Sequence, residues 1–168
     1  MKKWGVLILF SLFSLPVFAF EWSIWEPFSV PRQSGRHWIC GMDSVSGTDK
    51  TKDVSIKLIE STPFIQFDLH QGGWSFPQGA SVPVSLDFDD NEPLDLDAYG
   101  DGQIVSIAIP AELTSTFLSL VNEKKRVRVF FRNSHEAVWT ISLDGAGEAL
   151  MGMLACYKKW SVLPKKSH

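Results

Sequence analysis

Apolar and polar residues alternate along much of the chain. Val54, Ile56 and Leu58 are separated by polar residues, and strict alternation is typical of a strand with one buried face. This pattern, or a short apolar run between turn residues, predicts further strands at residues 37–42, 64–69, 82–88, 94–98, 104–109, 126–132 and 137–143. Polar or glycine-containing segments predict a loop at residues 43–52 and turns at 89–93 and 100–102.

Two later segments change to helical spacing. The first predicted helix follows Pro110, with Lys124 and Lys125 in its last turn, and its apolar positions are Leu113, Phe117, Leu120 and Val121. The second follows Asp144, a suitable N-cap, and its apolar positions are Ala146, Ala149, Leu150, Met153, Tyr157 and Trp160. We therefore predict a mainly β (α+β) fold, an antiparallel β-sandwich-like domain with two helices, the C-terminal one packed on the sheet.

The N-terminus resembles a secretory signal peptide. Lys2 and Lys3 precede an apolar stretch that ends at Val17-Phe18-Ala19, a suitable cleavage site. A membrane anchor is the alternative, but the stretch is shorter than the about 20 apolar residues that span a bilayer. We expect a signal peptide at residues 1–19, a single exported domain at 20–164 and a disordered tail at 165–168. The expected location is periplasmic or secreted, with no membrane span after cleavage.

The charge of the chain disfavours nucleic acid as a partner. The formal net charge is −3, and losing Lys2 and Lys3 with the leader makes it −5, whereas general nucleic-acid binders are usually basic. Aromatic residues crowd the start of the expected mature chain, at Trp22, Trp25 and Phe28. We expect these three to pack on the core, and an exposed aromatic patch for a partner is the alternative.

The chain has two cysteines, Cys40 and Cys156. Cys40 lies in a predicted strand, and Cys156 lies on or beside the buried stripe of the last predicted helix. In an exported protein this placement predicts a disulfide between them, and two independent buried thiols are the alternative. Closing so long a loop is worth ~4–5 kcal/mol as an upper figure.

An acidic run between residues 87 and 101 is the first candidate for chemistry. Its members are Asp87, Asp89, Asp90, Glu92, Asp95, Asp97 and Asp101. Calcium prefers such oxygen ligands, but the spacing does not fit an EF-hand. Alternation places Asp87, Asp95 and Asp97 on the outer face of a hairpin, so a solvated surface is the favoured interpretation.

The sequence offers no legible catalytic site. No two of the four histidines, His37, His70, His135 and His168, stand at metal-ligand spacing on one element. Nucleophile-elbow and phosphate-loop motifs are absent as well. We expect no enzymatic activity, no cofactor and no metal. A hydrolase with a dispersed site, in which His70 or His135 lies beside a carboxylate, is an alternative.

The C-terminal half resembles a family of small exported bacterial proteins. The segment WTISLDGAGEALMGMLAC, residues 139–156, is similar to the end of invasion-associated locus B-like proteins, where a strand leads into an alanine-containing helix. The order of the preceding helix around Phe117 and strand at 127–131 also matches, as does Pro77-Gln78-Gly79 before an alternating strand. Periplasmic accessory proteins of type VI secretion, of the VasI/TagO kind, have a similar ending that includes the cysteine. The resemblance implies a β-sandwich-like envelope protein without known catalytic residues.

These observations together predict an interaction protein. We expect a non-enzymatic accessory protein of the bacterial cell envelope, with a protein partner there and a link to secretion or host association. The alternative is an inhibitor or immunity-type module that blocks an envelope hydrolase, because a rigid disulfide-linked domain loses little entropy on binding.

Overall fold

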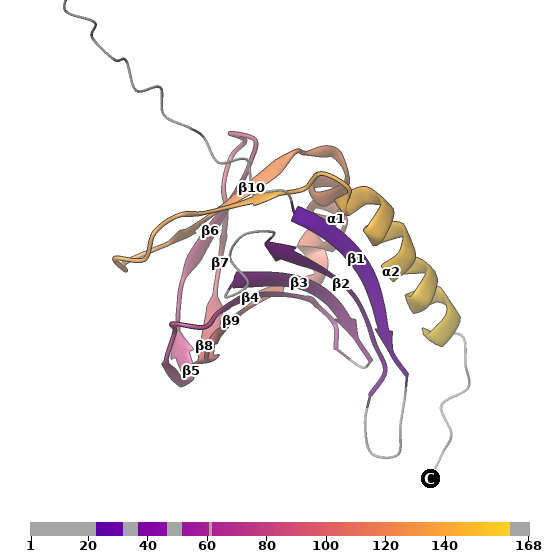
Figure 1. The fold of residues 1–168 in the computed structure, drawn as a ribbon, viewed down its shortest axis with the longest axis horizontal. Helices are drawn as coiled ribbons and strands as arrows, with labels where there is room; N and C mark the ends of the chain where they lie inside the picture. The colour runs from indigo at the N-terminus through magenta and orange to yellow at the C-terminus, as the bar shows by residue number, and fades with distance from the viewer. Residues whose placement is uncertain (1–22, 32–36, 47–51, 61, 162–168) are drawn as a thin grey trace, which may run out of the picture.

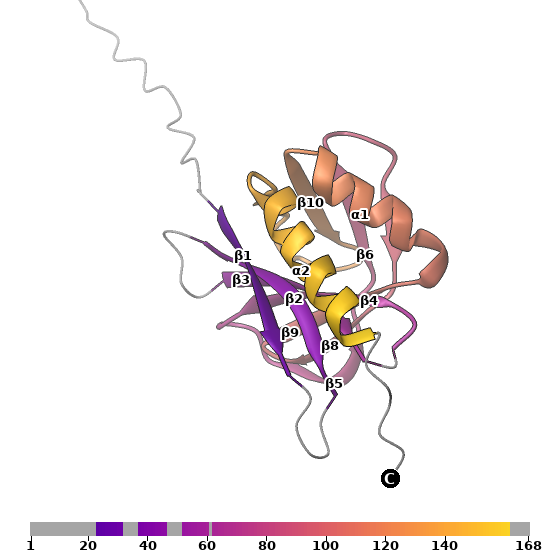
Figure 2. The same ribbon diagram turned by 90° about the vertical axis from the view of Figure 1, so that its right-hand side faces the viewer.

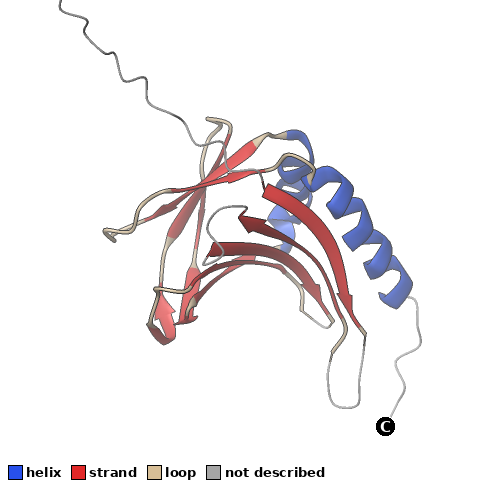
Figure 3. Ribbon diagram, viewed as in Figure 1, coloured by secondary structure: helices blue, strands red, loops and turns tan. Residues whose placement is uncertain are grey.

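The computed structural model describes residues 23–31, 37–46, 52–60 and 62–161. Two antiparallel sheets and two α-helices make up this part of the chain, so the predicted mainly β (α+β) class is confirmed (Figure 3). The expected signal peptide at 1–19, the tail at 165–168, Trp22 and His168 lie outside the described residues.

The larger sheet has seven strands in the order β1-β2-β3-β4-β9-β8-β5. Their bounds are β1 Ser23–Val30, β2 Ile39–Ser46, β3 Lys52–Ile59, β4 Ile65–Gln71, β5 Phe76–Ser81, β8 Ala98–Gly102 and β9 Ile104–Ile109. The smaller sheet has four, in the order β11-β10-β6-β7. Their bounds are β6 Val84–Phe88, β7 Leu94–Leu96, β10 Arg126–Phe131 and β11 Trp139–Ser142. The helices are η1 Ala111–Leu113, α1 Thr114–Glu123 and α2 Ala146–Ser161.

The strands of the larger sheet bend, and both α-helices lie on the outer side of the bend (Figures 1 and 2). The core fills the space between the outer side of the larger sheet, the helices and the smaller sheet. Phe117 of α1 joins the three, since its ring centroid lies 5.8 Å from that of Phe67 in β4 and 6.0 Å from that of Phe88 in β6. All three rings are fully buried.

Helix α2 packs on β1 and β2 through the first part of its predicted stripe. Ala146, Ala149, Leu150 and Met153 are buried, whereas Tyr157 is 43% exposed. The Tyr157 ring instead meets the edge of Trp38, with centroids 5.7 Å apart. The helix begins at Ala146, so Asp144 does not directly precede it as the prediction required.

Several predicted boundaries are wrong. Strand β2 continues to Ser46, into the loop predicted at 43–52, because it pairs with β3 as far as Val45 and with β1 as far as Ser46, and because Ser44 is buried there. Helix α1 ends at Glu123, so Lys124 and Lys125 follow its last turn instead of lying in it. The turn predicted at 100–102 lies inside β8, which pairs with β9 as far as Asp101.

The segment predicted as one strand at residues 94–98 belongs to two sheets. Leu94–Leu96 is β7 and pairs with β6 in the smaller sheet, while Ala98 begins β8 of the larger one. Leu96 and Ala98 are both buried, so the alternation persists through the crossing. Periodicity records which side chains are buried and does not record which sheet buries them.

Candidate binding surface

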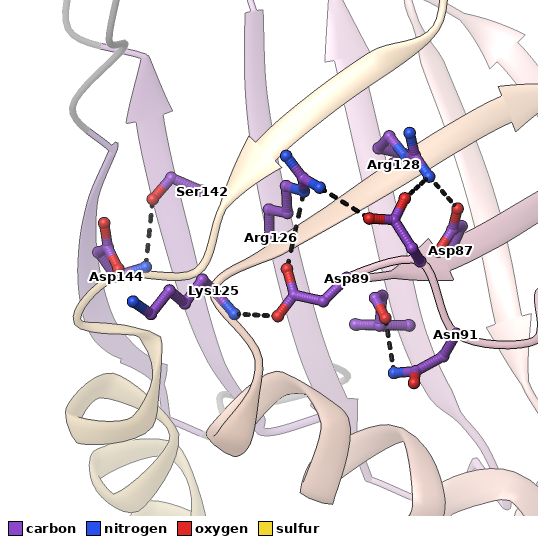
Figure 4. A network of polar contacts seen from close by, with 10 residues as sticks. Asp87, Asp89, Asn91, Lys125, Arg126, Arg128, Ser142 and Asp144 are labelled. Atoms are coloured by element: carbon purple, nitrogen blue, oxygen red, sulfur yellow. Dashed lines mark hydrogen bonds and ion pairs between the residues drawn. The ribbon is translucent and has the colours of Figure 1, made fainter.

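One member of the acidic run, Asp87, does not lie on the solvated outer surface that alternation predicted. Asp87 is buried, with 6% of the residue exposed. Strand β10 pairs with β6 so that Arg128 stands opposite Asp87, and its Nη2 lies 2.5 Å from Asp87 Oδ2 (Figure 4). The same guanidinium also bonds to Asp90. The hydrogen bond from Arg128 to Asp87 raises the pKa of the arginine above its ordinary value.

The turn after β6 is held by the same strand. Asp89 and Asp90 adopt positive φ angles of 49° and 62°, which aspartate tolerates in tight turns. The Lys125 backbone N–H donates to Asp89 Oδ2 over 2.9 Å, and Arg126 Nη2 lies 3.0 Å from Asp90 Oδ2 (Figure 4). These carboxylates therefore stabilise the pairing of β6 with β10. This structural role explains their presence without a bound cation.

Other members of the acidic run are exposed. Asp95 is paired with Arg132, whose Nη1 lies 3.3 Å from Asp95 Oδ2, and Asp97 and Asp101 point to solvent. Within the described ranges, no group of three His, Cys, Asp or Glu side chains is placed to hold a metal ion. The calcium interpretation thus gains no support from the arrangement of these residues.

The described histidines lie on separate parts of the molecule. His37 is exposed and its Nδ1 lies 3.7 Å from Glu60 Oε2, while His135 is exposed in the turn before β11. His70 does lie beside a carboxylate: its Nδ1 is 3.0 Å from Asp53 Oδ2 and its Nε2 is 3.2 Å from Gln103 Oε1. The hydrogen-bond partners of His70 are thus a carboxylate and an amide, and neither is a serine, threonine or cysteine side chain.

The two cysteines lie at disulfide distance. Their sulfur atoms are 1.90 Å apart and their Cα atoms 5.7 Å, a Cα separation that a disulfide requires. Cys40 is fully buried beneath α2, which brings Cys156 to it across a sequence separation of 116 residues. Such a pair fits an oxidising compartment.

No described helix or strand covers the inner side of the bent seven-stranded sheet (Figure 1). We call this side the open face. Among the described residues it includes Ile24, Glu26, Phe28, Val30, Ile39, Gly41, Asp43, Asp53, Ser55, Lys57, Ile59, Gln66, Asp68, His70, Ser81, Tyr99, Asp101, Ile104, Ser106 and Ala108. They alternate along each strand with the core side chains, whose side of the sheet meets the helices.

One row of the open face crosses all seven strands in register. Glu26 of β1 stands opposite Asp43 of β2, and each following residue stands opposite the next. The rest of the row is Ser55, Asp68, Ser106, Tyr99 and Ser81. Directly opposed residues lie about 5 Å apart, so Glu26 and Asp43 form a like-charged pair, which destabilises a sheet.

The charges of the row are unevenly compensated. Asp68 is satisfied, since Lys57 Nζ lies 2.7 Å from its Oδ2 and Gln66 Nε2 donates to its Oδ1 over 2.9 Å. No ion pair joins Glu26 or Asp43 to a cation within the described part of the chain. Partial burial, and then the neighbouring Glu26 and Asp53 carboxylates, raise the pKa of Asp43, against opposing effects of its backbone hydrogen bond and of the Lys57 charge.

Exposed apolar side chains gather on the same face. Seven large apolar residues in the described ranges are exposed, and four of them lie here. Ile24 is 67% exposed and Tyr99 54%, and the other two are Val30 and Ile104. Because isolated exposed apolar residues are ordinary, the informative feature is their location on one uncovered sheet face.

Sequence reasoning did not find the open face. Alternation did identify its polar positions one strand at a time, such as Ser55 and Lys57 of β3. It could not place β1 beside β2 or β8 beside β9, and so could not bring Glu26, Asp43 and Tyr99 into one row. The aromatic segment predicted to pack on the core is divided: Trp25 is buried, while Phe28 lies half-buried on the open face over Gly41.

No helix in the described residues is long and apolar enough to cross a membrane. Comparison of the chain with protein families, with curated proteins and with solved structures finds no match.

Proposed function

We propose that this chain is an exported protein of the bacterial cell envelope that binds a partner protein through the open face. Its role is that of an accessory in secretion or host association, and not that of an enzyme. The observation that carries the proposal is the inner face of the seven-stranded sheet, which no described element covers and which carries four of the seven large exposed apolar side chains of the described residues. Apolar side chains exposed among polar ones on one sheet face, where no described element covers them, suit an interaction site.

Two further features support export. Residues 1–19 have the charged start, apolar stretch and small-residue end of a cleaved leader. Cys40 and Cys156 lie at disulfide distance, as suits an oxidising compartment. A cross-linked scaffold also keeps β1 and β2, which contribute Glu26 and Asp43, in a fixed arrangement and so lowers the entropy lost on binding.

The export step is tested by intact-mass analysis of the full chain expressed with its own leader. We expect non-reduced material from the envelope fraction to lack residues 1–19 and to gain two hydrogens only after reduction. A retained leader and two free thiols in that fraction would contradict export.

The binding surface is tested by a photo-crosslinking side chain placed at Tyr99 in the producing cell. The matched control carries it at Met151, which is 66% exposed on α2, on the other side of the sheet. We expect a discrete covalent adduct with a protein from position 99 and none from position 151. Adducts from both positions, or from neither, would contradict binding through the open face.

A further inference from the structure

We infer that the partner bound at the open face is a basic protein segment that presents lysine or arginine together with apolar side chains. This inference rests on the proposed function and names the chemistry of its partner.

Charge is the first argument. Among the described residues, the open face carries Glu26, Asp43, Asp53, Asp68 and Asp101 against one lysine, Lys57, and the imidazole of His70. Two of the carboxylates, Glu26 and Asp43, stand directly opposite each other on β1 and β2. A guanidinium or ammonium group placed between them would pair with both and remove their repulsion. A like-charged pair in register, without an ion pair to any described cation, is thus complementary to a cation supplied from outside.

The apolar residues define the rest of the partner. Tyr99 of β8 lies in the row that starts at Glu26, five strands away from it, and Ile104 of β9 stands opposite Asp101 of β8. A tyrosine ring can hold a cationic side chain over its face, and isoleucine can hold an aliphatic one. A free metal ion or a small polyamine would leave these apolar contacts unused.

The dimensions favour a polypeptide. Six strands at a spacing of ~4.8 Å place Glu26 and Tyr99 roughly 24 Å apart along the row. That distance matches about seven residues of an extended chain. One short basic segment could therefore contact both the carboxylate pair and the tyrosine.

The same charges disfavour the other occupants. A second copy of the chain would set one acidic face against another in a two-fold interface, where like charges oppose association. Nucleic acids and anionic lipid surfaces are repelled for the same reason.

The test uses the mature protein and fluorescently labelled peptides of about ten residues, the length of the row with a small excess. One peptide alternates lysine and leucine and the other alternates glutamate and leucine. Anisotropy measures binding of each to the wild type, to Glu26→Gln/Asp43→Asn, and to the control Glu112→Gln/Glu148→Gln, whose carboxylates are exposed on η1 and α2.

We expect the lysine peptide alone to bind, and the open-face variant to bind it at least about fivefold more weakly, as the loss of two exposed ion pairs implies. The control variant should bind like the wild type. Raising NaCl from about 0.05 M to about 0.5 M should weaken binding. The inference would be overturned if the lysine peptide did not bind to the wild type. It would also be overturned if the open-face variant and the control variant bound this peptide equally, with or without a loss relative to the wild type.

A second copy as occupant is checked by light scattering. A mature protein that is dimeric and becomes monomeric on Tyr99→Ala substitution would overturn the inference, because the open face would then be an interface between copies.

The inference and the proposed function fail separately. An adduct from position 99 with no charge dependence of peptide binding refutes only the basic partner, whereas no adduct refutes binding through this face.

Discussion

The contribution of a single buried residue to the stability of this fold depends on the hydrogen-bond partner that the tertiary structure gives it. Trp25 and Trp74 are almost equally buried, at 7% and 6% exposed. The Trp25 Nε1–H donates to the Ser142 carbonyl oxygen over 2.9 Å and so joins β1 to β11. The Trp74 ring stacks on Trp139 with centroids 5.1 Å apart, but its Nε1–H has no partner in the described residues. An unpaired buried donor is unfavourable by about 1–3 kcal/mol.

The two tryptophans therefore should respond differently to the same substitution. We expect Trp25→Phe to lower the free energy of unfolding by about 1–3 kcal/mol, because it leaves the Ser142 carbonyl unpaired. Trp74→Phe keeps an aromatic ring and removes the unpaired donor. It should therefore lower the free energy of unfolding by less than Trp25→Phe does. Urea denaturation of both variants measures the difference, and a larger loss for Trp74→Phe would contradict the assignment of these hydrogen bonds.

The raised pKa of Asp43 gives a pH dependence with a definite sign. The folded protein holds the proton of the Asp43 carboxyl more tightly than the unfolded chain does, where the reference pKa is 3.8. The stabilisation from this group is complete below that value and is lost as pH rises through the raised native pKa. We expect Asp43→Asn to raise the unfolding free energy at pH 7 by up to about 0.5 kcal/mol.

The gain from Asp43→Asn should disappear near pH 3, about one unit below the reference pKa, where the wild-type carboxyl is protonated in both states. Urea denaturation at both pH values measures it. Asp101→Asn, an exposed neutralisation on the same face, is the control. A gain of equal size at low pH would show that desolvation and the Glu26 and Asp53 charges are not its cause.

At the scale of elements, close approach between α2 and β1 requires glycine. A Cβ atom added at Gly152 would lie 2.7 Å from Cβ and 2.8 Å from Cγ of Pro27. Pro27 is a residue of β1, and its ring is bonded to the backbone of that strand. A Cβ at Gly147 of the same helix would lie 2.8 Å from Asn122 Oδ1, the end of a flexible exposed side chain. Only the first contact resists adjustment, because Pro27 can yield only if the strand or helix moves.

We accordingly expect opposite effects from two alanine substitutions in α2. Gly152→Ala should lower the unfolding free energy by about 1–3 kcal/mol through overpacking, despite the better helix propensity of alanine. Gly147→Ala should leave it unchanged or raise it by up to about 1 kcal/mol. Thermal denaturation compares the two, and stabilisation by Gly152→Ala would mean that α2 does not pack closely on β1.

At the scale of the whole molecule, the cysteine pair links the second strand of the sheet to the last helix. Its separation of 116 residues encloses β3 to β11 and both remaining helices. Cross-linking so long a loop restricts the unfolded chain, by ~4–5 kcal/mol in the chain-entropy model. That figure is comparable with the total stability of a typical domain, about 5–15 kcal/mol.

Replacing both cysteines therefore should weaken the fold severely. We expect Cys40→Ala/Cys156→Ala to lose about 2–5 kcal/mol of unfolding free energy. A reducing agent should have a similar effect on the wild type and none on the double variant, as followed by urea denaturation. Equal stability of oxidised and reduced wild type would contradict a stabilising disulfide.

The amino-acid sequence by itself determined the local elements and their buried sides. Periods of two and of three to four residues depend only on neighbours along the chain, which is why β3, β4, β9 and the buried stripe of α2 are recoverable from it. The same reasoning paired Cys40 with Cys156, because only two cysteines exist and each lies on a core-facing position.

Only the tertiary structure decided which strand lies beside which. It moved Leu94–Leu96 and Ala98–Gly102 into different sheets, and it buried Asp87 against Arg128, although alternation had placed that carboxylate in solvent. It also assembled the open face from strands far apart in sequence. The physical reason is that strand pairing and ion pairs are non-local contacts, whose energies depend on register across the sheet and not on spacing along the chain.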